Sequence, residues 1–245
     1  MVNIKTLEQT LKANEFAITA EIPAPISASA SEIEEKIDLL TGHVHAINVT
    51  DNPGATAHMS SLAGCSIVRN KGIDPIFQVT CRDRNRLAIQ SDLMGASALG
   101  INNVLTLAGD PVKNGDQPDA KAVFDVNSKK ILSIMQSMND LGETMSGRQL
   151  QTKSNFFAGG AAIIHEPENN WDPVALKDKV TQGAKFIQTQ FCYDVDLLRD
   201  YMKHIVDAGL SEKLFFIVGI GPLRSDKSAK WMRDKLFGTV IPESI

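Results

Sequence analysis

The chain has 245 residues, of which 43% are hydrophobic and 22% charged, and its formal net charge is −4 at pH 7. This composition supports a full hydrophobic core and excludes a disordered chain. No basic cluster is present in the sequence, which argues against a nucleic-acid partner because such a partner requires a face rich in Lys and Arg.

The three cysteines, Cys65, Cys81 and Cys192, form no CxxC pair and are odd in number. We therefore expect neither a disulfide framework nor a zinc site, and no metal elsewhere. The first residues, MVNIKTLEQTLKANEF, have a polar helical pattern rather than an apolar signal segment. No apolar run approaches the roughly 18 residues of a membrane span. The sequence predicts a cytoplasmic protein with no membrane partner.

Strand-like apolar runs alternate with helical patterns along the chain. The predicted strands are Phe16–Pro23, Ala46–Asp51, Asp74–Cys81, Asn103–Gly109, Phe156–Ile164, Phe186–Tyr193 and Leu214–Leu223. The predicted helices cover residues 31–42, 57–71, 84–99, 125–141, 172–184, 194–209 and 225–236. Ser31 with Glu34 predicts a capping box, and Asp172-Pro173 predicts a cap followed by proline in the first turn.

These seven βα units follow one another without a long linker, which favours a single α/β domain over residues 1–245. We predict a (β/α)8 TIM barrel that lacks its eighth strand–helix unit, because the segment TVIPESI comes where the helix after strand seven ends. A doubly wound open sheet is the alternative, but no GxGxxG follows the first strand. We expect the natural protein to continue beyond Ile245, or another chain to cover an opening between strands one and seven.

Polar residues gather at the predicted carboxyl ends of the strands, where a βα barrel builds its active site. They include Glu21, Thr50, Asp51, Gln78, Thr80, Asp110, His165, Glu166, Gln188 and Gln190. Two carboxylates in a half-buried pocket can take different pKa values, one acting as an acid and one as an anion. For a single carboxylate, a helix cap or a contact to loop amides is an equally good interpretation. Glu21 and Asp110 together, with glutamines beside them, favour a functional site.

Four segments in order, EIPAP, CRDRNR…LGINNVLTLAGDP, KVTQGAKFIQTQFCYD and GIGPL, extend over nearly the whole chain. Together they resemble the methylenetetrahydrofolate reductase family. The resemblance implies a (β/α)8 barrel that holds a flavin at the carboxyl ends of its strands, FAD with FMN as the alternative. It also implies reduction of 5,10-methylenetetrahydrofolate to 5-methyltetrahydrofolate.

The resemblance also implies roles for single residues. Glu21 would be the general acid, partly buried and with a raised pKa, that protonates folate N10. Asp110 would stay ionised beside the flavin and the pterin, and Gln190 would contact the folate. The implied flavin contacts are Thr50, Thr80, Gly109, Asp110, His165 and Lys179, with Lys179 near the phosphates.

Three segments depart from the common family pattern. EIPAP stands where many members have EFFPP, TDNPGAT replaces a Tyr-Gly-Ala segment, and Gln78 stands where many have histidine. These differences leave the electron donor open, as NAD(P)H or a partner protein, and the assembly open, as a homo-oligomer or a complex with a partner subunit.

Two other functions remain as alternatives. One is a non-catalytic flavin- or folate-binding subunit of a one-carbon complex. The other is a TIM-barrel lyase or synthase acting on a phosphorylated substrate, which predicts a glycine-rich phosphate loop that GIGPL resembles only weakly.

Overall fold

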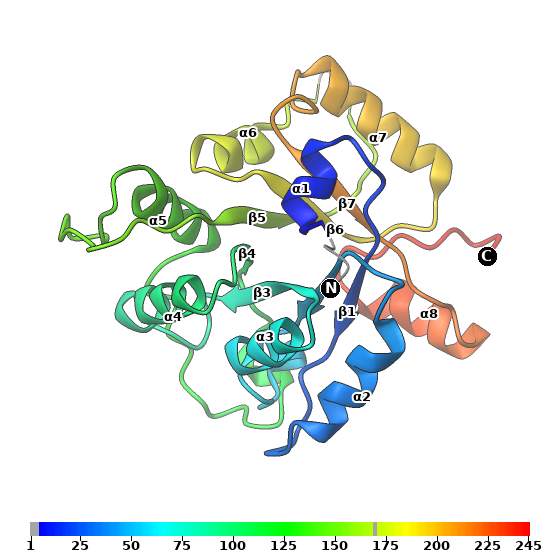
Figure 1. The fold of residues 1–245 in the computed structure, drawn as a ribbon. Coiled ribbons are helices and arrows are strands. Elements are labelled where there is room, and N and C mark those ends of the chain that lie inside the picture. Colours follow the sequence, from blue (N-terminus) through cyan, green and yellow to red (C-terminus); the bar gives the residue numbers. More distant parts are fainter. Residues whose placement is uncertain (1–4, 169–170) are drawn as a thin grey trace. The chain divides into compact units, whose positions relative to one another are not determined.

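The computed structural model describes residues 5–168 and 171–245. The strands follow one another in the sheet in chain order, β1 to β7, and the pairings with a described register are parallel (Figure 1). This order confirms the predicted α/β barrel class that lacks its eighth unit. It excludes the doubly wound alternative, whose strand order reverses at a switch point.

The chain divides into two compact units, one up to Gly159 and one from Gly160 to Ile245. That the whole chain acts as one domain stays a prediction, as does the opening between the first and seventh strands. The elements that begin in the first unit are α1 (Leu7–Lys12), β1 (Thr19–Ile22), α2 (Ser31–Leu40), β2 (Ala46–Val49), η1 (Pro53–Ala55), α3 (Ser61–Asn70), β3 (Asp74–Thr80), α4 (Arg86–Ala98), β4 (Asn103–Leu107), η2 (Val112–Asn114), α5 (Ser128–Asp140) and β5 (Phe157–Ala162).

The second unit contains the end of β5 and the remaining elements. These are α6 (Val174–Thr181), β6 (Phe186–Phe191), α7 (Val195–Asp207), β7 (Phe215–Gly219) and α8 (Asp226–Lys235). All seven predicted strands and all seven predicted helices therefore occur, in the predicted order.

The predicted strands are longer than the observed ones, chiefly at their carboxyl ends. Pro23 follows β1 and Pro222 follows β7, and proline has no N–H to continue a ladder. The helix predicted from residue 57 begins only at Ser61. The N–H of His58 donates to Asn52 Oδ1 and that of Met59 to the Pro25 carbonyl, so these amides are used outside a helix.

Both predicted helix caps are wrong. Ser31 lies inside α2, whose N-cap Ala30 has no side-chain cap, and Ser29 Oγ instead accepts the Ser31 N–H at 3.2 Å. Pro173 is the N-cap of α6, also without a side-chain cap.

A true capping box lies at α1. The Thr6 hydroxyl accepts from the Gln9 N–H, and the Gln9 side chain accepts from the Thr6 N–H. The segment TLEQ fits the rule for such a box, so the sequence carried a signal that we did not use.

The strands of the first unit are covered by helices (Figure 1). Helix α3 packs against β2 and β3, and α5 packs against β4. All four residues of β2 are buried, as expected for a parallel strand covered on both faces. At the amino end of β3, Asp74 Oδ2 accepts from the Leu7 N–H at 2.8 Å and from Asn103 Nδ2 at 2.8 Å. This partly buried carboxyl fixes α1 to the sheet, and burial raises its pKa.

Gly109, directly after β4, is a glycine that the fold of the first unit requires. Its φ is +91°, and a Cβ there would lie 2.9 Å from Arg82 Cβ and 3.3 Å from Thr80 Cβ. A side chain would therefore meet both backbone strain and a clash with the end of β3.

We expect Gly109→Ala to lower the free energy of unfolding by about 2–4 kcal/mol, from the left-handed backbone and the overpacking together. Gly95→Ala is the matched control, because Gly95 lies in α4 with its nearest neighbour, Leu62 Cδ2, at 3.7 Å. The control should gain about 1 kcal/mol from helix propensity. Urea denaturation of both variants measures the difference, and equal stabilities would contradict this account.

Candidate functional site

Glu21 at the end of β1 is held by two side-chain amides. Its Oε2 accepts from Asn48 Nδ2 at 3.1 Å and from Gln78 Nε2 at 3.0 Å. The register explains both bonds. Glu21 pairs with Asn48, Asn48 pairs with Ile76, and Gln78 lies two residues beyond Ile76 on the same face of the sheet. Asn48 and Gln78 are buried, whereas Glu21 is an exposed residue whose two hydrogen bonds to them are partly buried.

Asp51, just after β2, is the centre of a buried ion pair. Its Oδ2 accepts from the Thr80 N–H at 2.8 Å, from Thr80 Oγ1 at 2.9 Å and from Arg84 Nη1 at 2.7 Å. Arg84 Nη2 donates to the second oxygen at 3.0 Å, and Arg84 Nε pairs with Asp92 on α4 at 2.9 Å. The Asp51 side chain is only 2% exposed. This pair joins the end of β2 to the end of β3.

Arg82 makes a second connection between strand ends. Its Nη2 donates to the Asn52 carbonyl at 3.0 Å and its Nη1 to the Asp110 carbonyl at 3.2 Å. It also binds both oxygens of Asp83, each at 2.6 Å. Burial acts to raise the pKa of Asp83, but hydrogen bonds from Arg82 and Asn52 outweigh it and hold that pKa below its usual value.

This lowered pKa gives the Arg82–Asp83 contact a defined pH dependence. Its contribution to stability is present above the ordinary carboxyl pKa and is lost as pH falls through the lowered folded value. Asp92 behaves in the opposite way, because burial raises its pKa even though Arg84 lies beside it.

Asp110 lies directly after Gly109, with an exposed side chain. Its Oδ2 accepts from the Gly54 N–H at 2.9 Å, so it binds the loop that follows β2. A contact to a loop amide was the alternative interpretation that the sequence offered for a single carboxylate. The contact leaves the Asp110 side chain at the surface of the first unit. Among the other predicted flavin contacts, Thr80 is buried and donates to Asp51, and Thr50 Oγ1 accepts from the Ala24 N–H at 3.2 Å.

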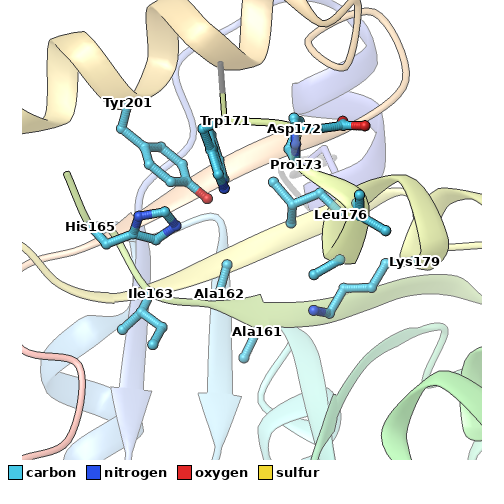
Figure 2. Close-up of a pocket in the computed structure, with 12 residues that line it drawn as sticks. Ala161, Ala162, Ile163, His165, Trp171, Asp172, Pro173, Leu176, Lys179 and Tyr201 are labelled. Carbon is cyan, nitrogen blue, oxygen red and sulfur yellow. The ribbon is translucent and has the colours of Figure 1, made fainter. Parts of the chain in front are cut away.

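The second unit contains a cavity of about 360 Å³ beside β5 and α6. Three rings line one side of it, His165, Trp171 and Tyr201, and Lys179 of α6 lines another (Figure 2). The His165 ring lies edge-on to Trp171 with centroids 4.8 Å apart, and edge-on to Tyr201 at 5.5 Å. Burial raises the pKa of Tyr201 to about 12. The sequence placed His165 and Lys179 in one site, and both do line this cavity.

Lys177 and Lys179 have different surroundings although they are two residues apart. Lys179 lines the cavity, whereas Lys177 Nζ pairs with Asp172 Oδ1 at 2.5 Å with nearly half of its side chain exposed. This is the arrangement that helical geometry predicts for positions i and i+2.

Gln190 at the end of β6 is bound to backbone within the second unit. Its Nε2 donates to the Phe237 carbonyl at 3.3 Å, and its Oε1 accepts from the Phe191 N–H at 3.0 Å. The segment after Gly238 continues beside β6, where the Val240 N–H donates to the Phe191 carbonyl at 2.9 Å. Gln190 is absent from the described lining of the cavity.

The residues that sequence reasoning missed are those that hold the carboxylates. The sequence assigned Asn48 only to the predicted strand Ala46–Asp51, and it gave the arginines of CRDRNR no role in a site. A polar amide inside an otherwise apolar strand, beside a strand-end glutamate, was the available signal. Three alternating arginines directly after a buried strand were another.

Two classes of feature are not found in the part of the chain that the structure describes. No helix there is long and apolar enough to cross a membrane. No group of three or more His, Cys, Asp or Glu side chains there could hold a metal ion.

Parallel strands in chain order, with polar residues grouped at their carboxyl ends, define a βα-barrel protein with a strand-end candidate site. The sequence model of one family, Methylenetetrahydrofolate reductase, matches residues 6–245. The chain belongs to the methylenetetrahydrofolate reductase family.

Curated relatives of this chain carry the family's name. Methylenetetrahydrofolate reductase 1 of Schizosaccharomyces pombe is 27% identical over 235 residues, covering 90% of this chain and 36% of that protein. Methylenetetrahydrofolate reductase (NADH) 1 of Zea mays is 24% identical over 232 residues, covering 91% and 38%. The chain thus spans little more than a third of these relatives.

A solved protein from Clostridium thermocellum, described as uncharacterized and as binding two copies of 5-methyl-5,6,7,8-tetrahydrofolic acid, has a similar fold. Its TM-score is 0.68 at 16% identity, and the match covers 97% of this chain and 77% of that one. At this identity the likeness is one of fold.

The buried Asp51–Arg84 pair predicts a large cost for removing one partner. Arg84→Leu leaves a buried carboxylate without its cation and should lower the free energy of unfolding by about 3–5 kcal/mol. Arg86→Leu is the control, because Arg86 pairs with Asp125 at the surface and should change stability by at most about 1 kcal/mol. Guanidinium denaturation at pH 7 measures both, and similar effects for the two variants would refute a dominant role for the buried pair.

Proposed function

We propose that the protein reduces 5,10-methylenetetrahydrofolate to 5-methyltetrahydrofolate with the aid of a bound flavin. The observation that carries this proposal is Glu21 at a strand end, held by Asn48 and Gln78 in a chain that the family model matches from residue 6 to residue 245. A carboxyl group oriented by two fixed amides is suited to deliver a proton to one defined atom.

The residues of the second unit fit part of a flavin cofactor. A cavity of about 360 Å³ with an aromatic wall and one lysine suits an aromatic, anionic ligand. Lys179 would bind phosphate oxygens and His165 would contact the cofactor beside it. From the first unit, Thr50, Thr80, Gly109 and Asp110 are the proposed contacts. FAD is the proposed cofactor, with FMN as the alternative.

The chemistry of the substrate explains why an acid is needed. The methylene bridge accepts a hydride only after the five-membered ring opens, and opening requires a proton on N10 and leaves a cationic iminium at N5. Glu21 would donate that proton. A reduced flavin, when bound, supplies the hydride to the iminium carbon.

Because Glu21 and Asp110 have different surroundings, the two carboxyl groups would have different roles. Ligands that cover the exposed Glu21 side chain would remove water from it and disfavour its charged form. Asp110, anchored to the Gly54 N–H, would remain an anion that accepts from pterin N–H groups and acts on the flavin through its charge. Gln190 would contact the folate.

The electron donor would be NAD(P)H or a partner protein, and the assembly a homo-oligomer or a complex with a partner subunit. We propose the cytoplasm as the compartment. The second candidate function, a non-catalytic folate-binding subunit, is favoured by the described binding of 5-methyl-5,6,7,8-tetrahydrofolic acid by the structurally similar protein. Reoxidation of the reduced, flavin-loaded protein by methylenetetrahydrofolate separates the two, because only an enzyme carries out this half-reaction.

Replacing Glu21 tests the proton donor. Glu21→Gln should retain flavin binding and lose about 10²–10⁴-fold in the rate of folate reduction, because an amide has no acidic proton to give. Glu35→Gln is the control, because Glu35 is an exposed glutamate within helix α2 and not at a strand end. Stopped-flow reoxidation measures the rate, and a Glu21→Gln variant as fast as the parent would remove Glu21 from the mechanism.

Replacing Lys179 tests the cofactor site separately from the chemistry. Lys179→Met should weaken flavin binding about tenfold or more, since a charge-assisted bond to phosphate contributes roughly 1.5–3 kcal/mol. Lys177→Met is the control, because Lys177 is itself absent from the described cavity lining, although its partner Asp172 belongs to that lining. Fluorescence titration of the apoprotein with FAD compares them, and equal affinities would argue against the phosphate contact.

A further inference from the structure

Arg82 is almost fully buried and uses its guanidinium group at several points at once. Its side chain is 2% exposed, and its guanidinium group donates four hydrogen bonds, to Asp83, Asn52 and Asp110. Because a guanidinium has five donors in one rigid plane, the position of each partner fixes the position of the others.

The two carbonyls that Arg82 binds belong to different loops. Asn52 follows β2 and has a left-handed backbone, with φ 45° and ψ 58°. Asp110 follows β4. Asp83 reinforces the first contact, because its Oδ2 accepts from Asn52 Nδ2 at 3.1 Å. Arg82 therefore sets the spacing between the loop after β2 and the loop after β4.

The same two loops meet at the Asp110 carboxylate. Its Oδ2 accepts from the Gly54 N–H at 2.9 Å, two residues after Asn52. Arg82 thus holds the backbone on both sides of this contact. Movement of either loop would turn the carboxylate away from its present direction.

We propose that Arg82 is a positioning residue that fixes the direction of the Asp110 carboxylate by holding the Asn52 and Asp110 carbonyls together. The inference rests on the proposed function, in which Asp110 acts on pterin and flavin. Arg82 itself touches neither ligand in this proposal.

Neighbouring arginines provide a matched comparison. Arg86 makes the same kind of bidentate pair, with both oxygens of Asp125 near the far end of the segment between β4 and α5, and these bonds do not involve the Asn52 or Asp110 carbonyl. Arg82→Lys keeps the positive charge but cannot span both carbonyls and Asp83 from one ammonium group. Arg86→Lys controls for the loss of a guanidinium, and Asp110→Ala shows the effect of losing the carboxylate itself.

The first measurement is hydrogen exchange of the Gly54 amide, which needs no ligand. Exchange at Gly54 should rise about tenfold or more in Arg82→Lys and in Asp110→Ala and should stay at the parent value in Arg86→Lys. Unchanged exchange at Gly54 in Arg82→Lys would overturn the proposal.

The second measurement uses the flavin-loaded protein and separates positioning from general support. Arg82→Lys should lower the folate reduction rate by about 10- to 100-fold and shift the flavin midpoint potential in the same direction as Asp110→Ala. The double variant should be no slower than Asp110→Ala alone, because both changes remove one function. Two results would show that Arg82 has only a structural role and would overturn the proposal. One is a double variant whose loss of rate is the full sum of the two single losses, and the other is an unchanged flavin midpoint potential in Arg82→Lys together with faster Gly54 exchange.

These readouts also distinguish two kinds of failure. If the parent protein binds FAD and folate but does not transfer electrons between them, the proposed function fails. In that case Gly54 exchange still decides whether Arg82 holds the Asp110 carboxylate.

Discussion

The buried contact between arginines and strand-end groups is the constraint on which the candidate site of the first unit depends. Asp51 and Arg84 join β2 to β3, and Arg82 joins β3 to the loops after β2 and β4. Taking such charges out of water costs several kcal/mol per ion, which only good geometry and complete hydrogen bonding offset. The network is therefore stable only when the ends of β2, β3 and β4 are in register, and this register sets the positions of the loops that carry Gly54 and Asp110.

Glu21 is held on a different principle. Asn48 and Gln78 are neutral, so they orient its carboxylate without adding a charge beside it. Their bonds follow from pairing between neighbouring strands, and the amides are buried while the carboxylate is exposed. A rigid polar base under an accessible carboxylate is the arrangement expected of a group that must meet a ligand. The arginine network fixes loops, and the amide pair fixes a side chain.

The sequence was sufficient for the fold because its signals repeat. Each βα repeat has an apolar run followed by a periodic helix. Strands β2 and β3 are buried along almost their whole length. It was not sufficient for the details of the strand ends. The start of α3 was misplaced because the N–H of His58 is used by Asn52, a contact across a loop that periodicity does not encode. From the sequence, Arg82 and Arg84 had no predicted role because the partners that join them to other strand ends, Asp110 and Asp51, lie far from them along the chain.

Gln78 connects the family pattern with the physics of the site. By the resemblance noted from the sequence, Gln78 stands where many family members have histidine, and here its amide donates to Glu21. A histidine at this position would change charge between about pH 5 and 8 and would alter the protonation of the neighbouring carboxylate as it did so. A glutamine never titrates, so the proton affinity of Glu21 no longer depends on a second ionisable group at this contact. Under the proposed function, control over the acid then moves from a titrating neighbour to the ligands that cover it. A single neutral replacement can thus remove one titrating group from the surroundings of the acid without moving the acid itself.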